Sequence, residues 1–347
     1  MSSDRESFTF RVGISLVIHN RLEEVKKTLD SLSQAITDLD RVCLVDNASS
    51  KSEKLDRLKN SYQQFHWVEN SENRGYAAAH HQALNWLMEQ NCQYCLLLNP
   101  DLTLPKTILD DLSHASRKVK DLWVLSPLLV RDEKEDPIID SAGLELDGFF
   151  RARDRFQGIQ KSKAFPGGGV STTQPVPALC GAMLWIPAQL LPLRPEALVF
   201  STDYFAYFED MELGMELQRR QVPMGLLPHI KVVHRRGGMS RLQKFTEKDW
   251  ISNPKQIRGA ILNRYRTLFR HNRLLFIFLR YPRLVPYEMM RWIYILFRKP
   301  WLLELIPEII RIFREETQRK RNPPIRRQHG SRKTVQGRYC SDNQSYS

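Results

Sequence analysis

The chain has 347 residues, of which 42% are hydrophobic and 26% charged, a composition typical of a folded protein with one large core or two smaller ones. Its formal net charge of +13 is unevenly distributed: residues 241–347 hold 24 Lys and Arg against 8 Asp and Glu, whereas residues 1–240 hold 28 against 31. A basic segment attached to a nearly neutral one indicates an element that binds an anionic surface, either nucleic acid or membrane. Five scattered cysteines argue against a disulfide-stapled secreted domain.

Residues 1–10 are polar and contain no apolar signal-peptide core. No apolar run in the chain approaches the roughly 18–20 residues that cross a bilayer. We therefore expect the protein in the cytoplasm, where its basic segment would meet the inner face of the membrane.

Short apolar segments alternate with helical periodicities through the first hundred residues. We predict strands at 12–18, 41–45, 66–68 and 94–98, and helices at 22–32, 55–58 and 76–88. This alternation predicts an α/β fold with a mixed, mainly parallel sheet and helices on both of its faces. In such sheets ligands bind beyond the carboxyl ends of the strands.

Polar side chains follow each of these four strands: Asn20, Asp46, Asn73 and Asp101. Each alone has a simpler interpretation, because Asn and Asp favour turns and helix caps. Four of them at one edge of a sheet indicate a ligand site instead. There Asp46 can accept a hydrogen bond from a base or a ribose, and Asp101 can bind a hard cation such as Mg²⁺ or Mn²⁺.

The later part of the chain contributes further candidates. Residues 131–178 break the alternating pattern and are expected to form a loop over the sheet. Glu209 and Asp210 follow an aromatic run and begin a predicted helix, and residues 232–234 are a predicted strand that ends in His234. Acidic residues suit helix N-termini in any case, and a lone His is more often structural, so a functional role depends on the combination.

These motifs together resemble the family 2 inverting glycosyltransferases with the GT-A fold, in particular the rhamnosyltransferase-like branch. The resemblance covers about residues 12–240 and depends on the order and spacing of six short motifs. They are Val45-Asp46-Asn47, Asn73-Arg74-Gly75, Asn99-Pro100-Asp101, Cys180-Gly181-Ala182, Tyr207-Phe208-Glu209-Asp210 and His234-Arg235-Arg236-Gly237.

The resemblance implies a role for each motif. Asp46 would read the nucleotide base, and the nucleotide-sugar site would also include Asn20, Asn73, Gly75, Asn99, Asp101 and Gly181. Asp101 and His234 would hold Mg²⁺ or Mn²⁺. Asp210 would be the general base that deprotonates an acceptor hydroxyl, with Glu209 as its supporting neighbour.

The expected reaction is the inverting transfer of a sugar, rhamnose in this branch, from a nucleotide-diphosphate donor to a hydroxyl of a glycan or lipid-linked glycan. The expected role is in cell-surface polysaccharide synthesis. Three places depart from the family pattern: residues 76–81 read Tyr-Ala-Ala-Ala-His-His where Phe-Ala-x-Gly-x-Asn is usual, Ser201-Thr202 stand where Asp-Glu is usual, and Glu216 stands near the usual place of an Arg. Asp101 is also the only carboxylate of its motif. A rival interpretation therefore remains, in which the protein binds a nucleotide or a glycan on the same fold without catalysis.

We expect three parts in the chain: a catalytic domain at 1–240, a basic amphipathic helical extension at 241–321 and a disordered basic tail at 322–347. Between 258 and 321 arginines interleave with Leu, Ile, Phe and Trp, which favours docking on an anionic membrane surface. No zinc spacing or RNA-recognition motif supports nucleic acid as a partner. The alternative is that these apolar faces pack on the catalytic domain.

Overall fold

The computed structural model of the protein describes residues 10–119, 122–167, 172–192, 199–236, 254–273, 277, 279 and 281–321. The strands are β1 (Val12–Ile18), β2 (Arg41–Asp46), β3 (His66–Glu69), β4 (Tyr94–Leu98), β5 (Leu102–Thr103), β6 (Val124–Val130), β7 (Ile139–Ser141), β8 (Leu144–Leu146), β9 (Ala152–Asp154), β10 (Gln174–Pro175), β11 (Met183–Pro187) and β12 (Met224–His234). The helices are α1 (Leu22–Ser33), α2 (Glu53–Ser61), α3 (Tyr76–Glu89), α4 (Ile108–Lys118), α5 (Lys161–Ala164), α6 (Glu209–Arg219), α8 (Pro254–His271), α10 (Leu284–Arg298) and α11 (Ile306–Arg321), with 3-10 helices η1 (Ala188–Leu190) and η2 (Pro300–Leu305).

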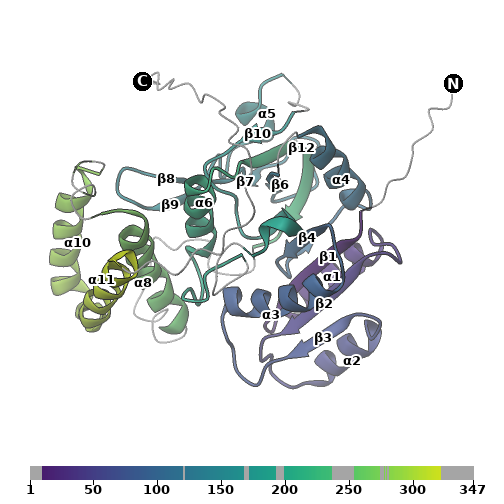
Figure 1. The fold of residues 1–347 in the computed structure, drawn as a ribbon, viewed down its shortest axis with the longest axis horizontal. Coiled ribbons are helices and arrows are strands. Elements are labelled where there is room, and N and C mark those ends of the chain that lie inside the picture. Colours follow the sequence, from purple (N-terminus) through teal and green to yellow (C-terminus); the bar gives the residue numbers. More distant parts are fainter. Residues whose placement is uncertain are drawn as a thin grey trace.

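The strands and helices predicted for the first hundred residues are confirmed to within a few residues. They build one half of a large mixed sheet, whose strand order is β10-β12-β6-β11-β4-β1-β2-β3 (Figure 1). In that half, β4, β1, β2 and β3 are parallel, so their carboxyl ends meet at one edge. In the other half β11 runs antiparallel to β4, while β12 is parallel to β6. The predicted mixed, mainly parallel α/β sheet is therefore confirmed.

Alternating side chains of β1 show why helices cover both faces of the sheet. Ile14 and Leu16 lie in the apolar core that also contains side chains of α1 and α4. Val17, which points to the opposite face, lies in the core that contains side chains of α3 and α6. Because neighbouring strand residues face opposite sides, a strand covered on both faces is apolar at nearly every position, as β1 is.

The segment 131–178, predicted to be a loop, contains short strands that the sequence did not indicate. Within it, β7 pairs antiparallel with β6, and β8 and β9 form a hairpin. These strands have only three residues each, too few for an alternating pattern to be visible in the sequence. The glycine run of this segment continues into residues 168–171, which lie outside the described part of the chain.

The C-terminal helices α8, α10 and α11 form a bundle beside α6, which confirms the predicted helical extension (Figure 1). Their shared apolar core includes Ile257, Tyr265, Ile295 and Leu305. Helix α8 contacts both α11 and α6, and thus connects the bundle to the sheet domain. Within the residues described here, no helix combines the length and the hydrophobicity needed to cross a membrane. The predicted tail at 322–347 lies outside the described residues.

Candidate active site

The loops that follow β1 and β2 are connected by the polar side chain of Asn20. Its Oδ1 accepts a hydrogen bond from the Ser50 amide (2.8 Å), and its own amide donates to Ser49 Oγ (2.9 Å). The backbone of Asn20 is left-handed (φ 59°), a conformation that Asn tolerates better than most residues. Asn20 therefore fixes the loop that lies beside Asp46.

Asp46, the last residue of β2, is buried next to this loop. Its Oδ1 accepts a hydrogen bond from the Ser49 amide (3.0 Å), and its Oδ2 pairs with Lys59 Nζ (3.1 Å). Lys59 also contacts Glu69 at the end of β3 (2.9 Å). The carboxylate is thus fixed at the strand edge where the sequence predicts the nucleotide.

Asn47 links the end of β2 to the loop after β3. Its Nδ2 donates to Asn73 Oδ1 (2.9 Å) and to the Gly75 carbonyl (3.3 Å). Its Oδ1 accepts from Asn70 Nδ2 (3.0 Å) and from the Arg74 amide (3.0 Å). The side-chain amide of Asn47 is therefore fully used in shaping this loop. In the sequence, Asn47 belongs to the motif Val45-Asp46-Asn47 but has no predicted role of its own.

Position 75 requires a glycine. Its φ of +83° is strained for other residues, and a Cβ there would lie 2.4 Å from the Phe205 carbonyl oxygen. This close approach lets the Tyr76 amide donate to that carbonyl (2.8 Å). The Tyr76 hydroxyl donates to the Gly181 carbonyl (2.8 Å). The start of α3 therefore joins the strand-edge loops to the segment that leads into α6.

Glu209 is buried and Asp210 is half-buried in the first turn of α6. Asp210 Oδ2 accepts a hydrogen bond from the Gly181 amide (3.1 Å), and Oδ1 accepts from the Met211 amide (2.8 Å). Glu209 Oε2 has no hydrogen-bond partner among the described residues. Burial raises the pKa of both carboxyl groups; the charge of Asp210 raises the pKa of Glu209 further, while backbone hydrogen bonds oppose the rise at Asp210. Such a pair can hold and transfer a proton near neutral pH.

A second buried cluster joins the ends of β4 and β12 to β7. Asp101 Oδ1 lies 3.2 Å from His234 Nε2, and Asp101 Oδ2 lies 3.3 Å from Arg21 Nη1. His234 Nδ1 lies 2.8 Å from Asp140 Oδ2. Burial by itself would lower the pKa of His234, but the contacts with Asp101 and Asp140 outweigh it and raise the pKa to about 9. Without a cation these contacts favour the protonated imidazole, and His234 then bridges the two carboxylates; a cation bound at Nε2 would take the place of that proton.

Arg236 extends the second cluster toward the first. Its Nε donates to Asp140 Oδ2 (2.8 Å) and its Nη2 to Asp154 Oδ2 (2.6 Å).

Residues 181–182 connect the two clusters. The Gly181 amide donates to Asp210 Oδ2 (3.1 Å), and the Gly181 carbonyl accepts from the Tyr76 hydroxyl (2.8 Å). The Asn99 amide, two residues before Asp101, donates to the Ala182 carbonyl (2.8 Å).

Asp101 and His234 fit a divalent cation. Neighbouring ligands around Mg²⁺ lie about 3 Å apart when each is about 2.1 Å from the metal, close to the 3.2 Å between Asp101 Oδ1 and His234 Nε2. Asp140 holds the other ring nitrogen, as carboxylates commonly do for metal-binding histidines. No group of three or more His, Cys, Asp or Glu that could hold a metal occurs in the described part of the chain. A cation here would therefore also need oxygen ligands from a substrate or water.

The structure gathers most of the predicted site residues at the carboxyl edge of the sheet. They are Asn20, Asp46, Asn73, Gly75, Asp101, Gly181, Glu209, Asp210 and His234. The predicted residue Asn99 lies at the end of β4, where its amide donates to the Ala182 carbonyl (2.8 Å).

Sequence reasoning missed Arg236 and Asp140 of the second cluster, and also Arg21 and Asp154, which contact its members. Arg236 lies within the motif that begins at His234, so that motif was the signal that could have found it. Asp140 is a single acid in the short strand β7, in a segment predicted to be a loop. No local pattern distinguishes it from the other acids of that segment.

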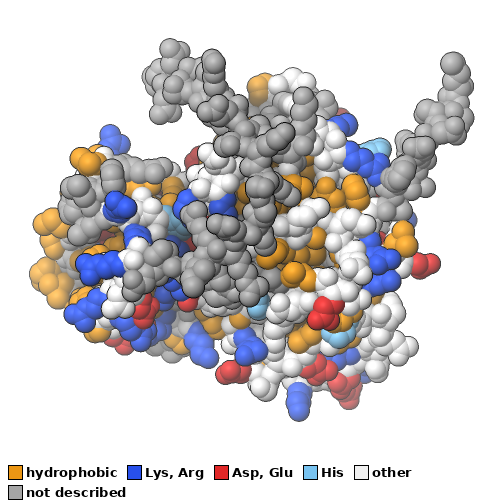
Figure 2. Space-filling model, viewed as in Figure 1, with side chains coloured by type: hydrophobic (Ala, Val, Ile, Leu, Met, Phe, Trp, Pro, Cys, Tyr) orange, Lys and Arg blue, Asp and Glu red, His pale blue; other side chains and the backbone are white. Residues whose placement is uncertain are grey.

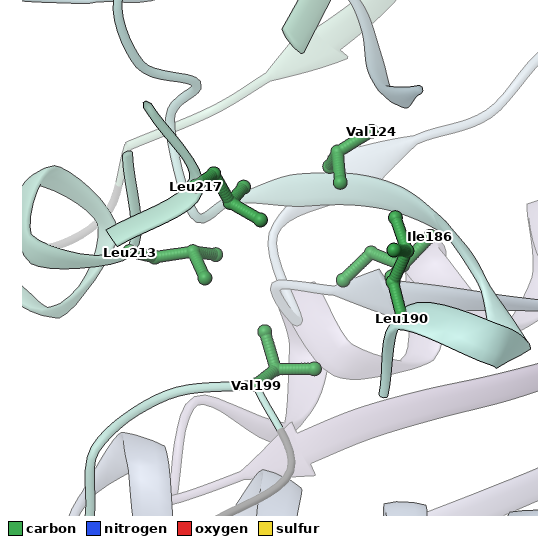
Figure 3. A pocket seen from close by; sticks show the side chains of 6 residues that line it. All are labelled: Val124, Ile186, Leu190, Val199, Leu213 and Leu217. Atoms are coloured by element: carbon green, nitrogen blue, oxygen red, sulfur yellow. The ribbon is translucent and has the colours of Figure 1, made fainter. Parts of the chain in front are cut away.

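Six aliphatic side chains line a small pocket between α6 and the sheet (Figure 3). They are Val124, Ile186, Leu190, Val199, Leu213 and Leu217. Binding sites for sugars and nucleotides present polar groups that fix the ligand, and this lining offers none. We therefore attribute the pocket to the packing of α6 on the sheet.

The profile of the family described as Glycosyl transferase family 2 matches residues 14–161. This segment contains Asp46, Asn73 and Asp101 and ends before Asp210 and His234. None of the curated proteins matches the chain.

Among solved structures, a crystal structure of GalNAc-T7 with UDP, GalNAc and Mn²⁺ superposes with a TM-score of 0.54 at 14% sequence identity, covering 76% of this chain and 48% of that one. This chain therefore spans about half the length of GalNAc-T7. The mannosyltransferase PcManGT from Pyrobaculum calidifontis, in complex with GDP-Man and Mn²⁺, gives a TM-score of 0.47 at 17% identity, over 92% of this chain and 77% of that one. S. aureus TarS gives 0.44 at 12% identity, over 74% and 42%.

The fold shared with GalNAc-T7 and the family match within residues 14–161 indicate the class of proteins to which this fold belongs, the GT-A-type glycosyltransferases. More narrowly, residues 14–161 form a Glycosyl transferase family 2 domain.

Replacing Gly75 by Ala should destabilise the protein by about 1–3 kcal/mol, because the new Cβ would meet the Phe205 carbonyl and the residue would keep a strained φ. Equilibrium unfolding in urea measures the change. Gly148→Ala is the matched control, because a Cβ at Gly148 would have nothing within 4 Å. Equal unfolding midpoints for the two variants would contradict the role assigned to Gly75.

Proposed function

We propose that the protein transfers a sugar from a nucleoside-diphosphate donor to a hydroxyl group of a glycan or lipid-linked glycan, with inversion at the anomeric carbon. The observation that carries this proposal is the half-buried Asp210 carboxyl, which accepts a hydrogen bond from the Gly181 amide and whose pKa is raised, at the edge of the sheet where Asp46 and Asp101 also lie. A sugar donor of the rhamnose type and a role in cell-surface polysaccharide synthesis follow from the resemblance in sequence, and both are part of the proposal.

In this reaction the acceptor oxygen bonds to the anomeric carbon while the bond from that carbon to the diphosphate oxygen breaks. Asp210 takes the proton of the acceptor hydroxyl, and its raised pKa makes it a stronger base than an ordinary Asp. The Gly181 amide holds Asp210 Oδ2 in place. Glu209, whose pKa is also raised, keeps its proton more readily and limits the negative charge beside the base.

The donor would lie along the strand edge. Asp46 is placed to accept hydrogen bonds from the base or ribose, and the loop shaped by Asn47 and Asn73 lies beside it. Asp101 and His234 would hold the divalent cation, whose charge would stabilise the leaving diphosphate. The Mn²⁺ bound in GalNAc-T7 and its UDP support this assignment.

The rival proposal is a nucleotide- or glycan-binding protein without catalysis. Its motives were Glu216, an acid near the usual place of an Arg, and Asp101, the single carboxylate of the motif Asn99-Pro100-Asp101. In the structure Glu216 accepts hydrogen bonds from Arg219 and Arg220, both at 2.6 Å for the shared oxygen Oε1. Since these arginines compensate its charge within α6, Glu216 gives little reason to exclude turnover.

The test of the proposed function is a screen of UDP-, GDP- and dTDP-sugars with the purified full chain, in which release of the nucleoside diphosphate is measured with candidate glycan and lipid-linked acceptors. Release that depends on an acceptor supports transfer. Tight nucleotide binding without release from any donor would support the rival.

Asp210→Asn preserves the size of the side chain and removes the proton acceptor. We expect kcat to fall by about 10²- to 10⁴-fold while the donor KM changes little. For the wild type, kcat/KM should fall on the acidic side as Asp210 becomes protonated, with a midpoint well above the ordinary Asp value of 3.8, because burial raises its pKa. Turnover close to wild type in Asp210→Asn would refute its assignment as the base.

Removal of divalent cations with excess chelator should abolish transfer, and Mn²⁺ or Mg²⁺ should restore it.

Asp140→Asn weakens the group that orients His234 and should lower Mn²⁺ affinity by about 10- to 100-fold, measured directly by electron paramagnetic resonance. Asp136→Asn is the control, because Asp136 contacts Ser162 at the surface. Unchanged Mn²⁺ affinity in Asp140→Asn would contradict the proposed cation site.

A cytoplasmic location at the inner face of an anionic membrane is also part of the proposal. Trp292 and Trp301, which the sequence suggested for membrane contact, are partly buried and pack against the core of the C-terminal bundle. Helix α10 instead presents a broad exposed apolar face, which Figure 2 shows beside Lys and Arg side chains at the left of the molecule. This face consists of Met289, Met290, Ile293, Tyr294, Leu296 and Phe297.

Replacing Met290 and Phe297 together by Ser should weaken binding to phosphatidylglycerol-containing vesicles by about tenfold or more, because burial of each side chain contributes about 1.5–3 kcal/mol. Vesicle flotation measures binding. Leu39→Ser combined with Met88→Ser is the control, since both side chains are 44% exposed on other elements. Equal binding of both double variants, or equal binding to pure phosphatidylcholine, would contradict docking through α10 on anionic lipid.

A further inference from the structure

Four consecutive carbonyl groups lead into the carboxyl pair of α6, and each accepts a hydrogen bond. The Phe205 carbonyl accepts from the Tyr76 amide (2.8 Å), and the Phe208 carbonyl accepts from the Glu212 amide (2.9 Å). The two carbonyls between them, those of Ala206 and Tyr207, accept from the side chain of a single residue, Asn263 of α8 (2.9 Å each). The segment 205–208 is therefore held from α3, from α6 itself and from α8.

This segment needs such support because its backbone is strained. Tyr207 and Phe208 both have a φ of 68°, in the left-handed region that non-glycine residues seldom adopt. Each such residue costs on the order of 1 kcal/mol and persists only where surrounding contacts hold it. Because Glu209 follows directly, the backbone at 207–208 sets the direction in which α6 begins and where the Asp210 carboxyl lies.

Asn263 is well suited to hold this backbone. It is 3% exposed, and its amide group has two N–H bonds, both of which are used by the two carbonyls. One turn earlier in α8, Gly259 allows the close approach, since a Cβ there would lie 3.1 Å from the Ala206 carbonyl oxygen. The helix thus presents a small residue and a double donor to the same two peptide groups.

Further contacts fix α8 against the neighbouring part of the sheet domain. The Tyr204 hydroxyl and Thr267 Oγ1 are hydrogen-bonded (2.9 Å), and Arg270 Nη1 donates to Ser201 Oγ (2.9 Å). His271 Nε2 lies 3.0 Å from Glu212 Oε1 in α6. Helix α8 therefore contacts the chain both before and after the carboxyl pair.

We propose that α8 is part of the catalytic unit and that Asn263 is a positioning residue, which places the Asp210 carboxyl by holding the strained backbone at 206–208. This inference rests on the proposed role of Asp210 as the base. The catalytic unit would then extend beyond residue 240 and include α8, a helix that the sequence analysis assigned to a separate extension. It also couples the base to the donor loop, because Gly75 and Tyr76 hold the opposite side of the same segment.

The experiment compares Asn263→Ala with Asn272→Ala in the full chain. Asn272 lies just beyond the end of α8, is 6% exposed, and its Nδ2 donates to the Leu268 carbonyl within α8 (3.0 Å), so its loss removes a buried hydrogen bond without touching the segment 205–208. With the UDP-, GDP- or dTDP-sugar that the wild type uses, Asn263→Ala should lower kcat by about 10- to 100-fold at little change in donor KM. Asn272→Ala should keep the wild-type kcat.

Gly259→Ala gives a second test that removes no hydrogen bond. Ala favours the helix more than Gly, yet its Cβ should push the Ala206 carbonyl by a few tenths of an ångström and lower kcat several-fold. If Gly259→Ala is as stable as the wild type but has a lower kcat, the loss of activity comes from the position of the segment and not from a lower stability of the protein. Wild-type kcat in both Asn263→Ala and Gly259→Ala would overturn the proposal.

Hydrogen–deuterium exchange keeps the two proposals distinguishable. In Asn263→Ala the amides of residues 205–212 should exchange faster than in the wild type and in Asn272→Ala, whether or not a donor is known. If the wild type turns over no donor, the proposed function fails. Faster exchange in Asn263→Ala would still show that Asn263 holds residues 205–208 in place. Unchanged exchange in Asn263→Ala would refute that support directly.

Discussion

Glu209 is buried and Asp210 half-buried, side by side at the beginning of α6, and taking carboxyl groups out of water opposes folding unless other groups stabilise them. Backbone amides stabilise Asp210, and the N-terminal end of a helix favours negative charge. Glu209 Oε2 has no such partner among the described residues. The same burial raises both pKa values, so the arrangement that opposes folding also makes a carboxyl able to accept a proton near neutral pH.

In the structure, arginines of the C-terminal part form ion pairs with acidic side chains of the protein itself. In α8, Arg264 pairs with Glu288 (2.7 Å), and Arg270 pairs with Asp203 and Glu316 (both 2.6 Å). These arginines hold the helical bundle together and fix it to the sheet domain, so they do not form a free cationic surface. A surface for membrane docking is therefore better sought in the exposed apolar side chains of α10 than in the count of arginines.

Short irregular elements complete the site. Asp140 in β7 and Asp154 in β9 both contact Arg236, just after the end of β12, and connect the Asp101–His234 pair to the neighbourhood of Asp210. The large sheet places the strand ends, whereas these short strands supply the charges that orient His234 and help to raise the pKa of Asp210. Variation in such segments can change a site without altering the main sheet.

The sequence by itself determined the alternating strands and helices as far as residue 98, because periodicity and turn chemistry are properties of neighbouring residues. It also located Asp46, Asp101 and Asp210, since each directly follows or begins a predicted element. Only the tertiary structure decided the partners of these residues. His234 meets Asp140 across 94 positions and Tyr207 meets Asn263 across 56, separations at which no local pattern records the contact. Burial, and with it the raised pKa of Asp210, likewise depends on side chains brought together by the whole fold.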